Sequence, residues 1–401
     1  MNSFPPLWLD YPYEERPALS ENIQTEIAIV GGGITGISAA IHLAQKGYKP
    51  VVLEKRTIAS GASGRNAGFL IAGSVEYYHR AIGFIGREKA KRLWALSLES
   101  HHTLRNWIRE FDIQCDYTND GSLVLATTPE EWSEIQEAAE KLRKDGFNAE
   151  TIESEELNRW GESLTKFTGG YYCSDDGSAN PARCVRGLAS AAENFGVPIY
   201  ENTPVLDYSE SGQNHVTLTM PDATIEAQMV LVAANAFTPQ LRNILDGKIL
   251  PVRGQMLATE PIDAKIAVPC YANFGFDYFR QTSDGRMIIG GSRDHNPDAE
   301  MGFDEEPNEQ IQSELEDYLM DLLDLDRSPE ITHRWTGTMG FARDGLPVIG
   351  RLPYSKHIYV AGGFTGHGMS IATKVAEIVS TLLIEGIHPD FSMFSIRRFL
   401  T

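Results

Sequence analysis

Apolar and polar residues follow one another along this chain with the periods of strands and helices in turn. Residues 27–30, IAIV, form an apolar and largely β-branched run of the kind found in buried parallel strands. Residues 37–44 then place apolar side chains on one face of a helix, which Gly47 ends, and residues 50–54, PVVLE, form a second strand. The spacing predicts a strand-helix-strand unit over residues 26–54, around which the rest of the chain is arranged.

Sequence patterns typical of strands and helices also follow one another through the rest of the chain. Residues 86–111 carry a helical apolar stripe, and two further helices follow capping residues with proline at the first helical position. One of these begins with a capping box at residues 128–131, TPEE, and the other begins after Asn180. Residues 239–333 are rich in strands, with a hairpin that turns at residues 283–285. Together these elements predict the α/β (α+β) fold class.

The turn between the first strand and the first helix has the sequence GGGITG. Gly31 permits the tight turn, Gly33 lets backbone amides approach a pyrophosphate, and Gly36 lets the helix pack closely on the strand. The helix terminus adds the positive end of its dipole. Glu54, at the tip of the second strand, is placed to accept hydrogen bonds from ribose hydroxyls and would repel a 2′-phosphate. The unit therefore predicts an FAD or NAD site rather than an NADP site, and a ligand-free glycine turn is the less favoured alternative.

Composition narrows the class of protein further. A chain of 401 residues is long enough for two or three domains, and a net charge of −20 disfavours nucleic-acid or anionic membrane partners. No secretory signal or transmembrane segment is predicted, and the ten histidines show no metal-ligand spacing, so we expect no metal site. The four cysteines lie far apart, which fits a reducing compartment and predicts a cytoplasmic protein. The sequence does not indicate the oligomeric state.

Seven motifs occur in a fixed order over nearly the full length of the chain. They are GGGITG, GASGRNAG, GSLVLATTPEE, DDGSANPARCVRGL, DGRMIIGGS, ARDGLPVIGR and GGFTGHGMS. In this order and spacing the chain resembles the D-amino-acid oxidase (DAO) family of FAD-dependent oxidoreductases, which includes glycine oxidase, sarcosine oxidase and γ-glutamylputrescine oxidase. It looks most similar to the γ-glutamylputrescine oxidase and glycine oxidase-like members.

The resemblance implies a Rossmann-type FAD-binding domain of the glutathione-reductase-2 type, interleaved with a mixed-sheet substrate domain. The FAD-binding domain is predicted at residues 1–75, 151–238 and 334–401, and the substrate domain at residues 76–150 and 239–333. The positions that match FAD-contacting positions of the family are Gly31, Gly33, Ile34, Thr35, Gly36, Glu54, Lys55, Gly61, Ala62, Ser63, Arg65, Asn66, Ala67, Gly68, Val205, Ala234, Asn235, Gly337, Gly363, Phe364, Thr365, Gly366, His367, Gly368 and Met369.

The resemblance also bears on how the flavin works. The turn GGFTGHG should place helix N-terminal amides beside the flavin, where they stabilise the negative charge of the reduced state by up to about 2 kcal/mol. Sarcosine oxidase-like members attach the flavin through a cysteine where this chain has Gly337, so non-covalent FAD is expected. Those members also use a lysine to activate oxygen where this chain has Ile288, which leaves O2 or another acceptor open. Because no second G-x-G-x-x-G occurs, the substrate itself should reduce the flavin.

The expected reaction is the oxidation of a small-molecule amine to an imine, which hydrolyses in water. The candidate catalytic residues are Tyr278, Arg280, Met339 and His367, with Tyr278 and Arg280 on one face of a strand. Met339 and Ser370 stand where related amino-acid oxidases carry a cation for the substrate carboxylate. A buried carboxylate without a cation is costly, so the sequence predicts an amine without an α-carboxylate, with Arg280 or Arg343 available for a distal acid.

Other interpretations stay open at this point. One is a D-amino acid or glycine oxidase or dehydrogenase. A second is a flavin-dependent tailoring or tRNA-modifying enzyme, although the acidic composition disfavours the tRNA version. A third is a flavin-binding subunit of a larger dehydrogenase without turnover of its own.

Overall fold

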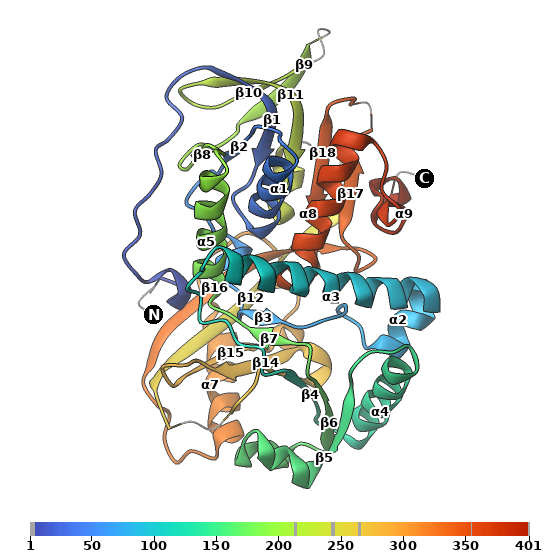
Figure 1. Ribbon diagram of the computed structural model, residues 1–401. Coiled ribbons are helices and arrows are strands. Elements are labelled where there is room, and N and C mark those ends of the chain that lie inside the picture. Colours follow the sequence, from blue (N-terminus) through green and yellow to red (C-terminus); the bar gives the residue numbers. More distant parts are fainter. Residues whose placement is uncertain (1–4, 212–214, 242–244, 264–265, 354, 400–401) are drawn as a thin grey trace.

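The computed structural model describes residues 5–211, 215–241, 245–263, 266–353 and 355–399, and two large β-sheets dominate it (Figure 1). Helices pack on both sheets, and the long helix α3 (Arg87–Glu110) crosses the middle of the molecule between them. This arrangement confirms the predicted mixed α/β fold class.

The first sheet is built around the predicted strand-helix-strand unit. Its order is β17-β18-β11-β1-β2-β8, with β10 and β9 attached at β11, and the pairs of β1 with β2 and with β11 are parallel. The last four residues of β1 are buried, as expected of a central strand. The strands are β1 (Ile23–Val30), β2 (Pro50–Leu53), β8 (Ile199–Tyr200), β9 (Asp207–Ser211), β10 (His215–Thr219), β11 (Thr224–Val232), β17 (Val348–Arg351) and β18 (Ile358–Gly362).

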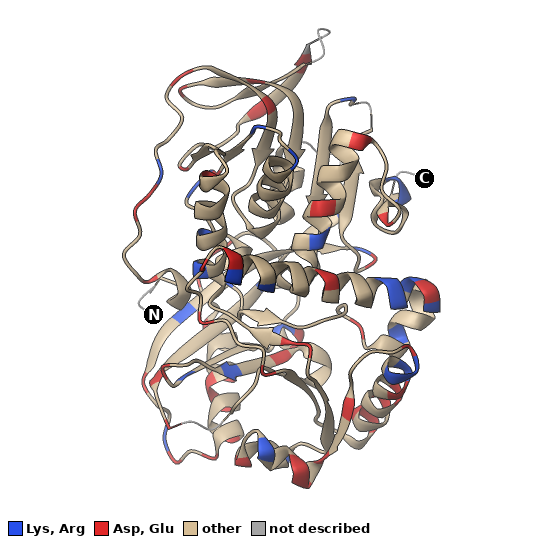
Figure 2. Cartoon of the chain, viewed as in Figure 1, with Lys and Arg blue, Asp and Glu red and all other residues tan. Residues whose placement is uncertain are grey.

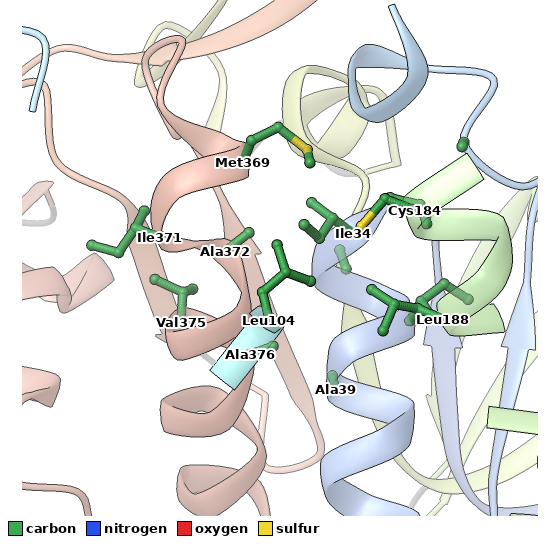
Figure 3. Close-up of a cluster of buried hydrophobic side chains, with 14 of the residues drawn as sticks. Ile34, Ala39, Leu104, Cys184, Leu188, Met369, Ile371, Ala372, Val375 and Ala376 are labelled. Atoms are coloured by element: carbon green, nitrogen blue, oxygen red, sulfur yellow. The ribbon is translucent and has the colours of Figure 1, made fainter. Parts of the chain in front are cut away.

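Three helices pack around this sheet and share one core with α3. They are α1 (Ile34–Gln45), α5 (Pro181–Asn194) and α8 (Gly368–Glu385). Figure 3 shows Leu104 of α3 between the ribbons of α1 and α8, close to Ala372 and Ala376. Leu104 is fully buried, and burial of such a side chain contributes about 1.5–3 kcal/mol. The small residues of α8 let the helices approach closely, which fixes where the first turn of α8 lies.

The second sheet has the order β16-β12-β15-β14-β13-β4-β6-β5. Its longest pair is antiparallel, with Gly254 of β12 opposite Gly337 of β16, and the predicted hairpin between β14 and β15 is confirmed. The strands are β4 (Ser122–Ala126), β5 (Glu150–Glu153), β6 (Gly169–Cys173), β12 (Ile249–Pro261), β13 (Cys270–Ala272), β14 (Asp277–Gln281), β15 (Arg286–Gly291) and β16 (Ile331–Ala342). A separate short pair joins β3 (Phe69–Leu70) to β7 (Gly177–Ser178).

The strand pairing can be compared with the predicted domains, although it does not define the domain boundaries. Strands β5 and β6 join the second sheet, although residues 151–238 were predicted in the FAD-binding domain, and β16 enters that sheet at Ile331. The predicted boundaries therefore stay predictions. The remaining helices are α2 (Tyr78–Ile85), α4 (Pro129–Lys144), α6 (Thr238–Leu241), α7 (Glu309–Leu323) and α9 (Phe391–Phe394).

The predicted helix starts are confirmed at α4 and α5. The Thr128 hydroxyl accepts a hydrogen bond from the backbone of Glu131 at 3.2 Å, and the Asn180 side chain accepts one from the backbone of Arg183 at 3.1 Å. The reciprocal half of the predicted capping box is wrong. The Glu131 carboxylate accepts the backbone N–H of Thr127, rather than that of Thr128, at 2.7 Å.

Basic and acidic residues are mixed along the helices that border the second sheet. Lys and Arg residues lie among Asp and Glu residues in α3 and α4 (Figure 2). Within the part of the chain that the structure describes, no helix is both long and apolar enough to cross a membrane, and no cluster of His, Cys, Asp and Glu could hold a metal ion.

Glu131 generates a stability prediction, because its fully buried carboxylate serves four donors. They are the backbone and hydroxyl of Thr127, the Tyr77 hydroxyl and the backbone N–H of Phe274, each at 2.7 Å. Glu131→Ala leaves these donors unpaired, so we expect the free energy of unfolding to fall by about 3 kcal/mol or more in urea titrations at saturating FAD. Glu130→Ala, at the exposed neighbour, should change it by less than about 0.5 kcal/mol. Equal effects of the two substitutions would contradict this prediction.

Candidate functional site

Two adjoining cavities share part of their lining, and cavity I lies at the carboxyl ends of the parallel strands of the first sheet. Cavity I begins at Val30, Leu53 and Ala233, which end or follow β1, β2 and β11. Ligands of open α/β sheets bind at this edge, where helix N-termini and strand ends converge. Cavity II lies beside the second sheet, and both cavities are lined by Ala62, Asn66, Met339, Gly366 and Met369. We define the junction of the two cavities by these five residues.

Most of the residues predicted to hold FAD line cavity I. These are Gly31, Gly33, Ile34, Thr35, Glu54, Lys55, Gly61, Ala62, Ser63, Asn66, Val205, Ala234, Asn235, Phe364, Gly366, Gly368 and Met369. Five others line cavity II, namely Arg65, Ala67, Gly337, Thr365 and His367. Gly36, Gly68 and Gly363 are not among the described lining residues of either cavity. The structure thus brings the predicted set together, while its contacts with FAD stay a prediction.

The glycine turn after β1 is shaped by close backbone approaches. Gly31 has a φ of +117°, and a Cβ there would lie 2.7 Å from the carbonyl oxygen of Ala233. A Cβ on Gly36 would lie 2.0 Å from the carbonyl oxygen of Gly31, so α1 can approach β1 only with glycine at this position. The first turn of α1 therefore opens directly onto cavity I, with amides that have no partner within the helix.

Glu54 lies at the predicted place, and its carboxylate also ties the turn together. It accepts the backbone N–H of Gly32 at 2.7 Å with one oxygen and that of Arg56 at 2.9 Å with the other. Each carboxylate oxygen keeps acceptor capacity towards cavity I. The neighbouring Lys55 ammonium lies 3.4 Å above the ring of Phe237, and burial lowers the pKa of Lys55.

The loop with the sequence GASGRNAG is held in shape by its own asparagine. The Asn66 amide donates to the carbonyls of Ala62 and Ser63 at 2.9 and 3.1 Å, and its oxygen accepts the N–H of Gly68 at 2.7 Å. Two further carbonyls of the loop accept hydrogen bonds from indole N–H groups. Trp8 donates to the carbonyl of Asn66, and Trp335 donates to the carbonyl of Arg65. These bonds fix the loop where the two cavities meet.

Arg280 supports the same loop and does not line cavity II. Its guanidinium donates to the carbonyl of Ala67 at 2.7 Å, to the hydroxyl of Ser178 at 3.0 Å and to the carbonyl of Ala179 at 2.9 Å. Burial lowers the pKa of Arg280 to about 10, so the group stays charged at neutral pH. The Arg280 side chain thus has a structural role, because its guanidinium holds this loop in place. Arg343, the other residue considered for a distal acid, is exposed and lines neither cavity.

The C-terminal glycine turn is fastened to the ends of two strands. The Asn235 side chain, just beyond β11, accepts the N–H of Gly363 at 2.9 Å. The backbone of Thr365 donates to the carbonyl of Gly340 in β16 at 2.9 Å, and the Thr365 hydroxyl accepts the N–H of Ala342 at 3.2 Å. His367 is the N-cap residue of α8, so the start of this helix lies at the junction of the cavities.

The candidate catalytic residues Tyr278, Met339 and His367 all line cavity II. Burial raises the pKa of Tyr278 to about 12, so its hydroxyl keeps its proton and can donate a hydrogen bond. Burial lowers the pKa of His367, which keeps the imidazole neutral at pH 7. Its Nδ1 lies 3.2 Å from the carbonyl oxygen of Thr365. Because a carbonyl only accepts, Nδ1 carries the proton and Nε2 is left as an acceptor.

Arg293 is a cavity II residue that the motifs did not reveal. It follows the end of β15, and its guanidinium carbon lies 4.8 Å from the ring centre of Phe276 and 5.8 Å from that of Phe341. Tyr77 and Tyr271, also in the lining, escaped notice as well. The only signal in the sequence is an arginine after GGS, and only the folded hairpin places it beside β16.

Comparison with known proteins gives a consistent result. The family model described as "DAO: FAD dependent oxidoreductase" matches residues 26–382. The probable oxidoreductase OrdL of Haemophilus influenzae is 29% identical over 92% of this chain and 85% of its own, and the gamma-glutamylputrescine oxidoreductase of Escherichia coli is 28% identical over 92% and 86%. The crystal structure of glycine oxidase from Geobacillus kaustophilus superposes with a TM-score of 0.80 at 23% identity, covering 93% of this chain and 98% of that chain.

The role of Arg280 generates a prediction about cofactor retention. Arg280→Leu removes three charge-assisted hydrogen bonds and leaves the Ala67 carbonyl, in the loop at residues 62–68 that is predicted to contact FAD, without its donor. We expect the purified variant to lose most of its flavin absorbance and its melting temperature to fall. Arg183→Leu, at an exposed arginine, should retain the flavin. Full flavin content in Arg280→Leu would contradict the proposed support of the loop.

Proposed function

The chain belongs to the DAO family of FAD-dependent oxidoreductases, and from this premise we propose that it oxidises an amine whose reacting carbon carries no carboxylate. Like its family it binds FAD and acts on amine or amino-acid-like substrates. We place FAD in cavity I with its flavin end at the junction, and the substrate in cavity II. The glycine turns and the amides at the starts of α1 and α8 support this placement.

The observation that carries the proposal is the absence of a free cation at the junction, among the residues that the structure describes. Met339 lies at the junction, and the Ser370 hydroxyl donates to the carbonyl of Ile71. The nearby Arg65 guanidinium is bound to Ser60, Thr336 and Glu305. An α-carboxylate at the reacting carbon would lose its hydration here without gaining a counter-ion, which costs several kcal/mol.

The chemistry is divided between the cofactor and the protein. Bound FAD supplies the acceptor for a hydride from the amine C–H bond. The residues of cavity II orient the amine and exclude water: Tyr278 offers a hydroxyl donor, and its ring packs edge-on against Tyr271 with centroids 6.1 Å apart. A covalent flavin link is not expected, since Gly337 has no side-chain atom to form one, and a Cβ there would lie 3.0 Å from the Cβ of Arg65.

His367 is proposed to accept a proton from the bound ammonium. An amine can give up hydride only after it has lost its positive charge, and the neutral ring of His367, which lines cavity II, keeps Nε2 as an acceptor. Protonation of His367 at low pH removes this acceptor. Because burial lowers the pKa of His367, the acceptor form is complete at neutral pH and is lost only as the pH falls below about 6.5, the ordinary value for histidine.

An anaerobic screen tests the proposed substrate class. We expect γ-glutamylputrescine or another N-acylated putrescine to bleach the flavin band of the holoenzyme, and glycine and D-alanine to do so at least 100-fold more slowly, because a desolvated carboxylate costs several kcal/mol. Faster reduction by glycine or D-alanine would contradict the proposal and favour an amino-acid oxidase. Absence of reduction by any amine would favour a flavin-binding subunit.

The pH dependence of flavin reduction tests His367. In the unaltered protein the limiting rate should reach a plateau near neutral pH. In His367→Gln, the rate at pH 7 should fall by about 10²–10⁴-fold. The variant's rate should also keep rising towards about pH 10, where a primary amine loses its own proton. His102→Gln, at an exposed histidine, should keep the plateau. A plateau retained in His367→Gln would exclude the proton-accepting role.

A further inference from the structure

A tight turn after β15 directs Arg293 onto the wall of cavity II. Gly291 and Ser292 have φ values of +136° and +53°, and a Cβ on Gly291 would lie 2.1 Å from the carbonyl oxygen of Phe276. The backbone of Ser292 donates to the Asp277 carboxylate at 3.3 Å. The turn is therefore fixed from β14, and the next side chain, Arg293, extends along the cavity wall.

Two aromatic rings hold the guanidinium of Arg293 in place. Its distances of 4.8 Å to the ring centre of Phe276 and 5.8 Å to that of Phe341 are in the range of cation–π contacts. The residue is half-buried, so its charge is only partly hydrated. The positive charge also reaches the rest of the cavity: it opposes the rise that burial causes in the pKa of Tyr278 and adds to the fall that burial causes in the pKa of His367.

No carboxylate of the described chain neutralises Arg293. Among the described residues, none accepts a hydrogen bond from it or forms an ion pair with it. The other cationic side chain in the cavity lining, Arg65, is paired with Glu305 at 3.0 Å. The acid in the lining, Glu76, lies 3.9 Å from Arg80. In a chain with a net charge of −20, an arginine left without an acid in an aromatic cavity indicates an anionic ligand.

The spacing along β16 sets the scale of that ligand. Met339 lies at the junction and Phe341, against which Arg293 packs, lines cavity II two residues further along the strand. Alternate residues of a strand share a face and are roughly 7 Å apart. The carboxylate of a simple α-amino acid is bonded directly to the reacting carbon, so it stays at the junction when that carbon is there. An anion on a longer chain can.

We infer that Arg293 binds a carboxylate at the far end of the substrate, several bonds from the carbon that is oxidised. A single guanidinium matches the charge of one carboxylate and its planar fork matches the two oxygens, whereas a phosphate dianion would keep excess charge against the aromatic rings. The inference rests on the proposed function, because it takes the junction as the site of amine oxidation.

Two amines that differ only in the terminal group provide the test. N-glutarylputrescine ends in a carboxylate and N-pentanoylputrescine ends in a methyl group. For the holoenzyme we expect kcat/KM to be about 10- to 100-fold higher with the glutaryl amine. In Arg293→Leu this preference should disappear through a higher KM for the glutaryl amine, and the pentanoyl amine, measured beside it, reports any change in the step that the two amines share. Arg293→Lys should restore part of the preference, because it keeps the charge and loses the fork.

Arg159→Leu is the matched control, because Arg159 also lies over an aromatic ring, Trp160 at 4.5 Å, and lines neither cavity I nor cavity II. Its preference should equal that of the unaltered protein, and flavin absorbance verifies that each variant holds FAD. Equal kcat/KM for the two amines in the unaltered protein, or a preference that survives Arg293→Leu, would overturn the role of Arg293 and leave the proposed function standing. If neither amine reduces the flavin and no amine of the anaerobic screen does, the proposed function fails, and this inference fails with it.

Discussion

The capture of the loop at residues 62–68 by donors from the second sheet is the interaction on which both cavities depend. Arg280 in β14 and Trp335 in β16 bind carbonyls of this loop, whereas the loop follows directly from the strand-helix-strand unit of the first sheet. Glycine and alanine give the loop little packing of its own, so its shape must be imposed by partners. The bonds that hold the loop are therefore also the bonds that join the two sheets around the junction.

Three charged side chains of the described residues, two buried and one half-buried, differ in their physical roles. Glu131 and Arg280 are each surrounded by several uncharged hydrogen-bonding partners, which compensate for the loss of water and fix loops in place. Arg293 has aromatic rings around it and no acid. A charge with several hydrogen-bonding partners in the protein stabilises the fold, whereas a charge without such partners remains available to a ligand. The partners of a charged side chain therefore distinguish a structural residue from a candidate binding residue better than its residue type does.

Sequence reasoning succeeded where structure is determined locally. The strand-helix-strand unit, the starts of α4 and α5 and the β14-β15 hairpin follow from periodicity, capping and turn residues, and all are confirmed. It failed where partners come from far along the chain. Glu131 was assigned to a capping box, yet it binds Phe274, which is 143 residues away. Arg280 was considered for the substrate, yet its guanidinium donates to the carbonyl of Ala67, 213 residues away. The arginine after GGS did not indicate a cavity residue, because the place of Arg293 depends on a turn packed against β14 and on a ring in β16.

The alternation of β16 separates two ways of altering this protein. Met339 borders both cavities, so an exchange there changes the lining of both together. Phe341 and Arg293 line cavity II and not cavity I, so exchanges at those positions leave the described lining of cavity I unchanged. With cofactor and substrate placed as proposed, a lineage with this scaffold would diversify the far end of its substrate in small steps without losing the flavin, whereas a change in what the reacting carbon carries would require a coordinated change at the junction.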